Sequence, residues 1–373
     1  MIYLDYASHT PACPAALEAF CHSSGAFIAN PMASHREGRR GREELERITG
    51  EMAQLIGIAQ GEIILTSGAS EANNLAIKGI ARAYRHVGRR ILSTCLEHPS
   101  VSGTLAALQN EGYEIELLKM LPDGTIDLVH LEKALSPDTV LLCISAVDSE
   151  LGAIQPVNEI TRILSGFPNC HLHVDAAQAM GKNPLHTEGL STMSFSAHKF
   201  HGICGSGGLV KRENVVLEPL IHGGASTTLY RSGTPALALA AACLKALEAA
   251  VYEQDERLAK VRRLREFLQN SLVKYPGVKI NSPFSGSPYI LNLSVREVKG
   301  SLFQAELDKQ GVCISVKSAC STDSAPSRPV MAISSRKNAM ASWRISISHL
   351  TEMRELEAFM DIFQTCYKEL TNR

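Results

Sequence analysis

The sequence lacks several features that would assign it to a class at once. Its ten cysteines form no C-x-x-C pair, so neither a disulfide framework nor a structural zinc site is indicated. No long basic run is present and the formal net charge is only -1, which is not the balance of a protein that binds polyanions. We therefore expect no metal and no direct nucleic acid binding.

A charged leader and long apolar runs are also missing. The first residues, "MIYLDYASHTP", have no basic segment followed by an apolar one, so we expect no signal peptide. The stretch "LALAAACLKALEAAV" comes closest to a membrane span, but Lys245 and Glu248 interrupt it, and it indicates a buried or amphipathic helix. These absences predict a protein of the reducing cytoplasm without membrane contact.

The hydrophobic content, by contrast, is ample. With 373 residues and 45% hydrophobic side chains, the chain can bury more than one core. Between residues 62 and 209, short apolar runs such as "EIILTSG" and "TVLLCISAV" alternate with longer amphipathic ones. This alternation predicts an α/β fold, with a mainly parallel sheet covered by helices on both faces.

Beyond residue 250 the pattern changes. A long charged helix precedes short strands at "YILNLSV", "VCISV" and "WRISIS", and a final helix begins near Glu352. We therefore predict a large domain at 15–250 and a smaller α+β domain formed by 1–14 and 251–373.

Residues that follow the predicted strands are the first candidates for a site, because parallel sheets bind ligands beyond the carboxyl ends of their strands. After "EIILTSG", Gly68 permits a tight turn and Ser70 is a good helix N-cap, which makes an anion site, although an ordinary capped helix is commoner. After "HLHV", Asp175 could bind a metal, orient a histidine, hold a cationic ring nitrogen or simply cap a helix.

Two further candidates follow strands. Lys199, in "SAHKFHG", could act as an amine nucleophile if it is partly desolvated, although a surface lysine is the commoner role. His98 could stack on a ligand or protonate it, and an ordinary loop histidine is the alternative. Together with Asp175 and the Gly68 turn, these residues match what pyridoxal 5′-phosphate needs: a lysine, a carboxylate, a flat group and a phosphate site.

One cysteine has unusual neighbours. Cys320 lies in "KSACSTDSAPSRP", among serines, prolines and an aspartate, whereas a buried structural cysteine usually has apolar neighbours. Composition alone makes it a candidate working thiol on a loop.

Ordered motifs along nearly the whole chain show a resemblance. They include "YLDYASHTP", "TSGASEANNLAIKG", "LEHPSV", "HVDAAQAMGK", "SFSAHKFHG", "RSGT", "SACS" and "WRISIS". In this order they resemble the cysteine desulfurases, pyridoxal-phosphate enzymes of fold type I in the class V aminotransferase group. The resemblance implies a seven-stranded sheet in the large domain, a homodimer, and a catalytic cysteine loop in the small domain.

The resemblance also implies roles for individual residues. Thr234 would reach the phosphate of the neighbouring subunit, and Arg344 would bind the substrate carboxylate, a task suited to a bidentate guanidinium, with a structural ion pair as its alternative. The residues expected to hold the cofactor are Ala69, Ser70, His98, Ser149, Asp175, Gln178, Ser196, His198, Lys199 and Thr234.

The catalytic residues implied are Lys199, His98 and Cys320. Lys199 would bond to the cofactor and then act as a base, and His98 would help to move protons. Cys320 would attack the sulfur of L-cysteine, giving alanine and a persulfide for a sulfur-acceptor or scaffold protein, in iron–sulfur cluster assembly or tRNA thiolation.

The chain departs from the family pattern at three places. Asp148 and Ser149, in "VDSE", stand where two asparagines are usual, so a contact to the cofactor or substrate is weakened or admits water. His9 and Cys204 also differ, and for both we favour the absence of a role.

Two other functions stay open. One is another lyase or aminotransferase of the same group, such as a selenocysteine lyase, and Cys320 argues against it because most of those reactions need no protein thiol. The other is a non-catalytic homologue that binds a partner through the dimer surface, and Lys199 and Asp175 argue against that.

Overall fold

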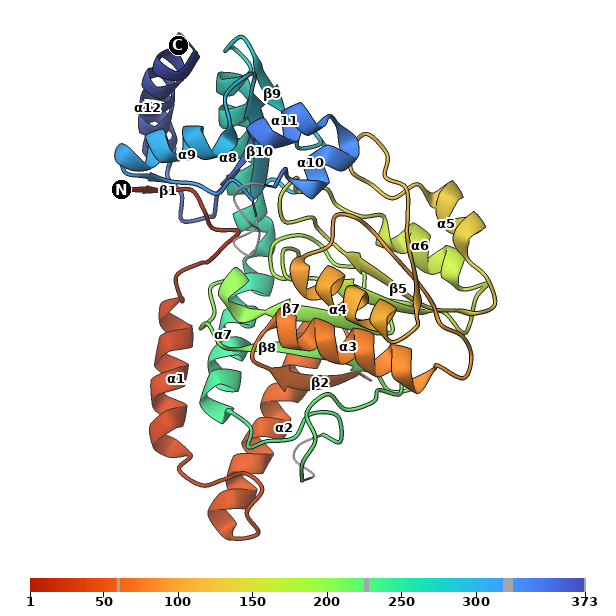
Figure 1. Cartoon of the computed structure of the whole chain (residues 1–373). Helices are drawn as coiled ribbons and strands as arrows, with labels where there is room; N and C mark the ends of the chain where they lie inside the picture. The colour runs from red at the N-terminus through yellow and green to blue at the C-terminus, as the bar shows by residue number, and fades with distance from the viewer. Residues whose placement is uncertain (59–60, 225–227, 318–324, 372–373) are drawn as a thin grey trace.

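A seven-stranded sheet forms the centre of the larger half of the molecule (Figure 1). The computed structural model describes residues 1–58, 61–224, 228–317 and 325–371. Within them the strand order is β2-β8-β7-β6-β5-β3-β4, and β8, which pairs antiparallel with both β2 and β7, is the one strand that runs opposite to the others. The predicted mainly parallel α/β sheet is therefore confirmed. Its strands are β2 (Gly61–Thr66), β3 (Arg90–Ser93), β4 (Glu114–Leu117), β5 (Thr139–Ser145), β6 (His171–Asp175), β7 (Thr192–Ser196) and β8 (Gly207–Arg212).

Helices cover both faces of this sheet, because side chains along a strand alternate between its faces. In the fully buried β5, Leu141 and Cys143 pack with α3 (Ala69–Ala83) and α4 (Pro99–Asn110). Leu142 and Ile144 belong to the core on the opposite face. The helices on or beside that second core are α1 (Pro14–Ala26), α2 (Arg36–Ile56), α5 (Leu128–Ala134), α6 (Val157–Leu164) and α7 (Leu237–Tyr252).

The smaller half has its own sheets and core. Three antiparallel strands pair in the order β12-β10-β9, and β1 pairs in parallel with β11, so the N-terminal segment returns to this half. Trp343 and Phe363 both stack on Phe303 in its core. The elements are β1 (Ile2–Tyr3), α8 (Gln254–Leu272), β9 (Val278–Ile280), β10 (Ile290–Val295), α9 (Gly300–Lys309), β11 (Val312–Cys313), α10 (Arg328–Ile333), α11 (Arg336–Ala341), β12 (Ser342–Ser346) and α12 (Met353–Thr371).

The strand predicted at "VCISV" is shorter than expected. β11 ends at Cys313, because the chain then changes partner: Ser315 exchanges backbone hydrogen bonds with Arg344 instead of continuing along β1. One main core takes its buried residues from 15–250, and the other takes its buried residues from 1–14 and 251–373. The domain boundaries themselves stay a prediction. Over the described part of the chain, no helix combines the length and the apolar character that a membrane crossing needs.

Candidate active site

A cavity of ≈ 230 Å³ lies at the carboxyl ends of β2, β5, β6 and β7. The structure brings ten of the predicted residues to its walls: Ala69, Ser70, His98, Ser149, Asp175, Gln178, Ser196, His198, Lys199 and Arg344. It is also lined by Ala7, Ser8, Ser100, Ser145, Val147 and Ala177. Of the other two predicted residues, Thr234 does not line this cavity and Cys320 lies outside the described residues.

Lys199 reaches the cavity from the end of β7. A single 3₁₀ turn, Ala197–Lys199, follows the strand and carries the lysine past the sheet edge. Its Nζ donates to the carbonyl oxygens of Ala7 at 2.8 Å and Ser8 at 2.7 Å. The N-terminal segment therefore forms one wall of the site and holds the amine in place.

Asp175, the last residue of β6, is buried and well supplied with donors. Its Oδ2 accepts from Asn73 Nδ2 at 2.8 Å, and its Oδ1 accepts from the Ala177 backbone N–H at 2.9 Å. Asn73 is itself fixed, since its Oδ1 accepts from His173 Nε2 at 3.0 Å and from the Ser194 hydroxyl. Burial lowers the pKa of His173 to about 4, so this histidine is neutral at pH 7. A carboxyl group placed in this way can pair with a protonated ring nitrogen.

His98 caps the N-terminus of α4 with its ring. Its Nδ1 accepts from the Ser100 backbone N–H at 3.2 Å and contacts the Ser100 hydroxyl at 2.8 Å. A nitrogen that accepts carries no proton, so in the neutral ring the proton is on Nε2. Burial lowers the pKa of His98, which favours this neutral form. The Ser100 hydroxyl also accepts from Asn73 Nδ2 at 2.9 Å, which links His98 to the Asp175 network.

The start of α3 and the end of β7 form a cradle that suits a phosphate. Helix α3 offers backbone N–H groups at its N-terminus, and the Ser196 hydroxyl lies close enough to accept from Ala69 N at 2.7 Å. Gly68 has φ 152°, and a Cβ there would come within 3.1 Å of Ser196 Oγ. Within the described structure, the buried His198 Nδ1 has no hydrogen-bond partner. These donors fit the phosphate of pyridoxal 5′-phosphate.

The prediction that Ser70 caps α3 is wrong. The helix begins at Ala69 with Gly68 as its N-cap, so Ser70 lies inside the first turn. The glycine can take this position because its φ is one that other residues rarely adopt. Ser70 nevertheless lines the cavity.

Arg344, on β12, is both ion-paired and turned to the cavity. Its side chain is 2% exposed, and its Nη2 binds Asp5 Oδ1 at 2.8 Å and Ser8 Oγ at 3.0 Å. Its Nη1 donates to the Ser149 carbonyl at 2.7 Å. The Nε has no partner among the described residues. The structural ion pair considered as the alternative therefore exists, and the guanidinium still has a donor for a carboxylate.

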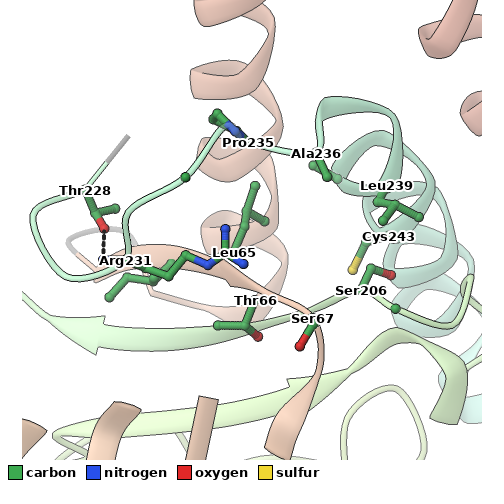
Figure 2. A pocket seen from close by; sticks show the side chains of 15 residues that line it. Leu65, Thr66, Ser67, Ser206, Thr228, Arg231, Pro235, Ala236, Leu239 and Cys243 are labelled. Atoms are coloured by element: carbon green, nitrogen blue, oxygen red, sulfur yellow. Dashed lines mark hydrogen bonds between the residues drawn. The ribbon is translucent and has the colours of Figure 1, made fainter. Parts of the chain in front are cut away.

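The "RSGT" segment lies beside a second cavity, of ≈ 100 Å³, at the end of β2 (Figure 2). Arg231 and Gly233 line this cavity, and Arg231 Nε forms an ion pair with Glu71 Oε1 in the first turn of α3 at 2.9 Å. Thr234 is exposed. Its expected reach to a neighbouring subunit stays a prediction.

The altered "VDSE" segment follows β5. Ser149 lines the cavity, and its backbone, not its hydroxyl, makes the recorded contact with Arg344. Asp148 is buried, and its Oδ1 accepts from the backbone N–H groups of Glu150 and Leu151. No partner for its Oδ2 exists in the described parts of the chain. Burial, reinforced by Glu150, raises the pKa of Asp148 to about 7.

This pKa predicts a pH-dependent effect of Asp148→Asn. The folded protein holds the Asp148 proton more tightly than the unfolded chain, in which the pKa of this carboxyl group is near 3.8. The stability gained from the neutral form is therefore lost as the pH rises toward 7. Asparagine stays neutral at every pH. We therefore expect the difference in melting temperature, variant minus parent, to increase from pH 5 to pH 8. Thermal melts across this range measure it, with the exposed Asp308→Asn as the control. A difference that is constant with pH would show that Asp148 does not titrate there.

Neither of the other two departures lines the cavity. The exposed His9 ring stacks on His198, with ring centroids 5.5 Å apart. Cys204 is exposed and does not line the cavity. That neither has a role in the reaction stays a prediction.

Sequence reasoning missed several polar residues that support the site. Asn73 is three residues after Ser70, so it lies on the same face of α3, and that spacing could have revealed it. Ser145 ends β5 and donates to the buried Glu97 at 2.7 Å. Burial raises the pKa of Glu97 to about 7. Across the described residues, no three histidine, cysteine or acidic side chains gather as a metal site.

Comparisons with known proteins identify the family of the chain. The aminotransferase class-V family model matches residues 2–359. The chain therefore belongs to the class-V aminotransferase family, and to its pyridoxal-phosphate-dependent cysteine desulfurase branch. A cysteine desulfurase IscS of Dictyoglomus turgidum is 34% identical over 99% of this chain and 95% of its own length. A NifS/IcsS protein homolog of Lactobacillus delbrueckii subsp. bulgaricus is also 34% identical, over 100% of this chain and 98% of the relative.

Solved structures show the same likeness. A NifS-like protein superposes with a TM-score of 0.91 at 29% identity, covering 100% of both chains. The structure named "SspA in complex with cysteine" has a TM-score of 0.80 at 29% identity, over 93% of this chain and 99% of that one.

Proposed function

We propose that this protein is a cysteine desulfurase that binds pyridoxal 5′-phosphate, converts L-cysteine to L-alanine, and takes the sulfur onto Cys320 as a persulfide. The observation that carries the proposal is the convergence of Lys199, Asp175 and His98 on one cavity that Arg344 also lines. When bound, the cofactor supplies an electron sink for the substrate α-carbon.

The residues around the cavity divide the work. The Lys199 amine, at the wall formed by Ala7 and Ser8, removes the proton from the α-carbon. His98 carries its proton on Nε2 and can donate it. Arg344 binds the substrate carboxylate.

Cys320 then accepts the sulfur. Its thiolate attacks the substrate sulfur, so that a new S–S bond forms. The substrate C–S bond breaks, its electron pair stays with carbon, and a proton completes alanine. The terminal sulfur is left on Cys320 for a reductant or an acceptor protein.

The assay that tests this function is release of sulfide and alanine from L-cysteine in the presence of a reductant. We expect both products in equal amounts. L-serine, which has the same size but no sulfur, serves as the matched substrate control. Alanine without sulfide or persulfide, or turnover of L-serine at a similar rate, would favour another lyase or an aminotransferase of the group.

The proposal extends to the assembly. We propose that the enzyme is a homodimer in which Thr234 of one subunit reaches the phosphate of the other. The enzyme delivers sulfur to an acceptor or scaffold protein in iron–sulfur cluster assembly or tRNA thiolation. A reducing compartment such as the cytoplasm suits a chain whose function needs a free thiolate.

The role of Arg344 leads to a prediction for Arg344→Lys. Lysine keeps the charge but has neither the planar guanidinium nor its Nε–H, the donor that has no partner among the described residues. We therefore expect the KM for L-cysteine to rise about tenfold, which corresponds to roughly 1.4 kcal/mol. Steady-state kinetics measure the change, with the exposed Arg336→Lys as the control. An unchanged KM would mean that Arg344 serves only its ion pair with Asp5.

A further inference from the structure

A buried lysine lies directly behind the cofactor cavity. Lys182 follows β6 in "DAAQAMGK" and its side chain is buried, with 7% of the residue exposed. Its Nζ donates to Gln178 Oε1 at 3.0 Å. Gln178 is one of the residues that line the cavity, but Lys182 is not. The lysine therefore contacts the cavity wall through Gln178 and does not line the cavity itself.

The surroundings of Lys182 destabilise the charged form of its side chain. Burial lowers its pKa to about 7, and the positive charges of Lys199 and Arg344 act in the same direction. A small cavity beside it is lined by His201, Arg257, Tyr289 and His349, among others, and none of the described residues that line it is a carboxylate. Nearby His198, His201 and His349 are kept neutral at pH 7, chiefly by burial. A buried lysine in such a setting lowers stability, so a functional reason for it is expected.

The contact with Gln178 gives that reason. In its ammonium form, below about pH 7, Lys182 only donates hydrogen bonds, so the amide oxygen of Gln178 faces it. The amide nitrogen then turns the other way, and it donates to the Ala7 carbonyl at 2.8 Å, on the cavity wall. Nε2 carries two hydrogens, and the second has no partner in the described structure. That second hydrogen is available to an acceptor in the cavity.

We propose that Lys182 is a positioning residue for the cofactor: it holds the Gln178 amide so that an Nε2–H donor is presented to an oxygen of pyridoxal 5′-phosphate. The inference rests on the proposed function. Without Lys182, only the bond to the Ala7 carbonyl keeps the amide from turning over and presenting its oxygen to the cavity, where it would repel a phenolate oxygen. In its ammonium form, Lys182 also polarises the amide, which makes the N–H a stronger donor.

The test compares Lys182→Met with the parent enzyme and with the exposed control Lys245→Met. Methionine is flexible and of similar length, so it fills the same buried space, and Lys182→Gln is the second variant if Lys182→Met does not fold. The first readout is the dissociation constant of the cofactor, titrated into apoprotein. We expect binding to weaken about tenfold, the effect of losing one well-made hydrogen bond to a charged group.

The second readout is the pH at which the visible spectrum of the bound cofactor changes. A cation lowers the pKa of a protonated nitrogen near it, so removal of Lys182 should move this midpoint to higher pH. A residue that only supports the fold would leave the midpoint in place.

A double variant decides whether Lys182 acts through Gln178. In a Gln178→Leu background, Lys182→Met should cause little further loss of cofactor affinity, because the two changes remove the same interaction. The same tenfold loss in both backgrounds, or parental affinity and midpoint in Lys182→Met, would overturn the inference. A parent protein that takes up no cofactor would refute the proposed function, and this inference with it.

Discussion

Lys199→Ala is expected to give a folded protein that has lost the visible absorption of lysine-bound cofactor and about 1,000-fold or more of its desulfurase activity, the size typical of a lost general base. The reason is that Lys199 places its amine against the Ala7 and Ser8 carbonyls at the end of β7. Absorption spectra and the sulfide assay measure the two effects. The exposed Lys245→Ala serves as the control.

Two outcomes would contradict this prediction for Lys199→Ala. If Lys199→Ala kept the absorption band, another amine would hold the cofactor. If both parent and variant lacked the band while the protein remained folded, the chain would be a homologue that does not use the cofactor.

Cys320→Ser is expected to lose nearly all sulfide release, by about 100-fold or more, while the cofactor spectrum stays unchanged. A serine hydroxyl is not ionised near neutral pH and does not attack sulfur, whereas a thiolate does. The matched control is Cys204→Ser, because Cys204 is exposed and stands outside the cavity walls. We expect that control to retain parental activity.

Retention of full activity by Cys320→Ser would rule out the persulfide route on that residue. Loss of activity in Cys204→Ser as well would give the second thiol a role that we have not assigned.

The sequence predicted the large sheet well, for a physical reason. Strands buried on both faces appear as continuous apolar runs, and β5 is buried at every position. The sequence predicted the strands less well where the backbone changes the strand with which it pairs. β11 stops at Cys313 because Ser315 pairs with Arg344, a contact between segments far apart in the chain.

The candidate site shows the same division. Residues at strand ends, such as Lys199 and Asp175, could be predicted because parallel strands bring their carboxyl ends together. The supporting contacts could not. That Lys182 faces Gln178, or that Asp5 pairs with Arg344, depends on side-chain directions and on long-range packing.

Ser70 illustrates a local error. Its residue type favours the N-cap, but the helix begins two residues earlier, at Ala69, because Gly68 adopts a backbone conformation that is open mainly to glycine. Capping preference was therefore overridden by the turn that closes the end of β2.

The central claim, that sulfur passes from L-cysteine to Cys320, is tested most directly by mass spectrometry of the protein after exposure to L-cysteine without reductant. We predict the mass of added sulfur on the peptide that contains Cys320 in the parent enzyme, and none in Lys199→Ala. An unmodified Cys320 peptide, or sulfur found only on Cys95 or Cys204, would contradict the account.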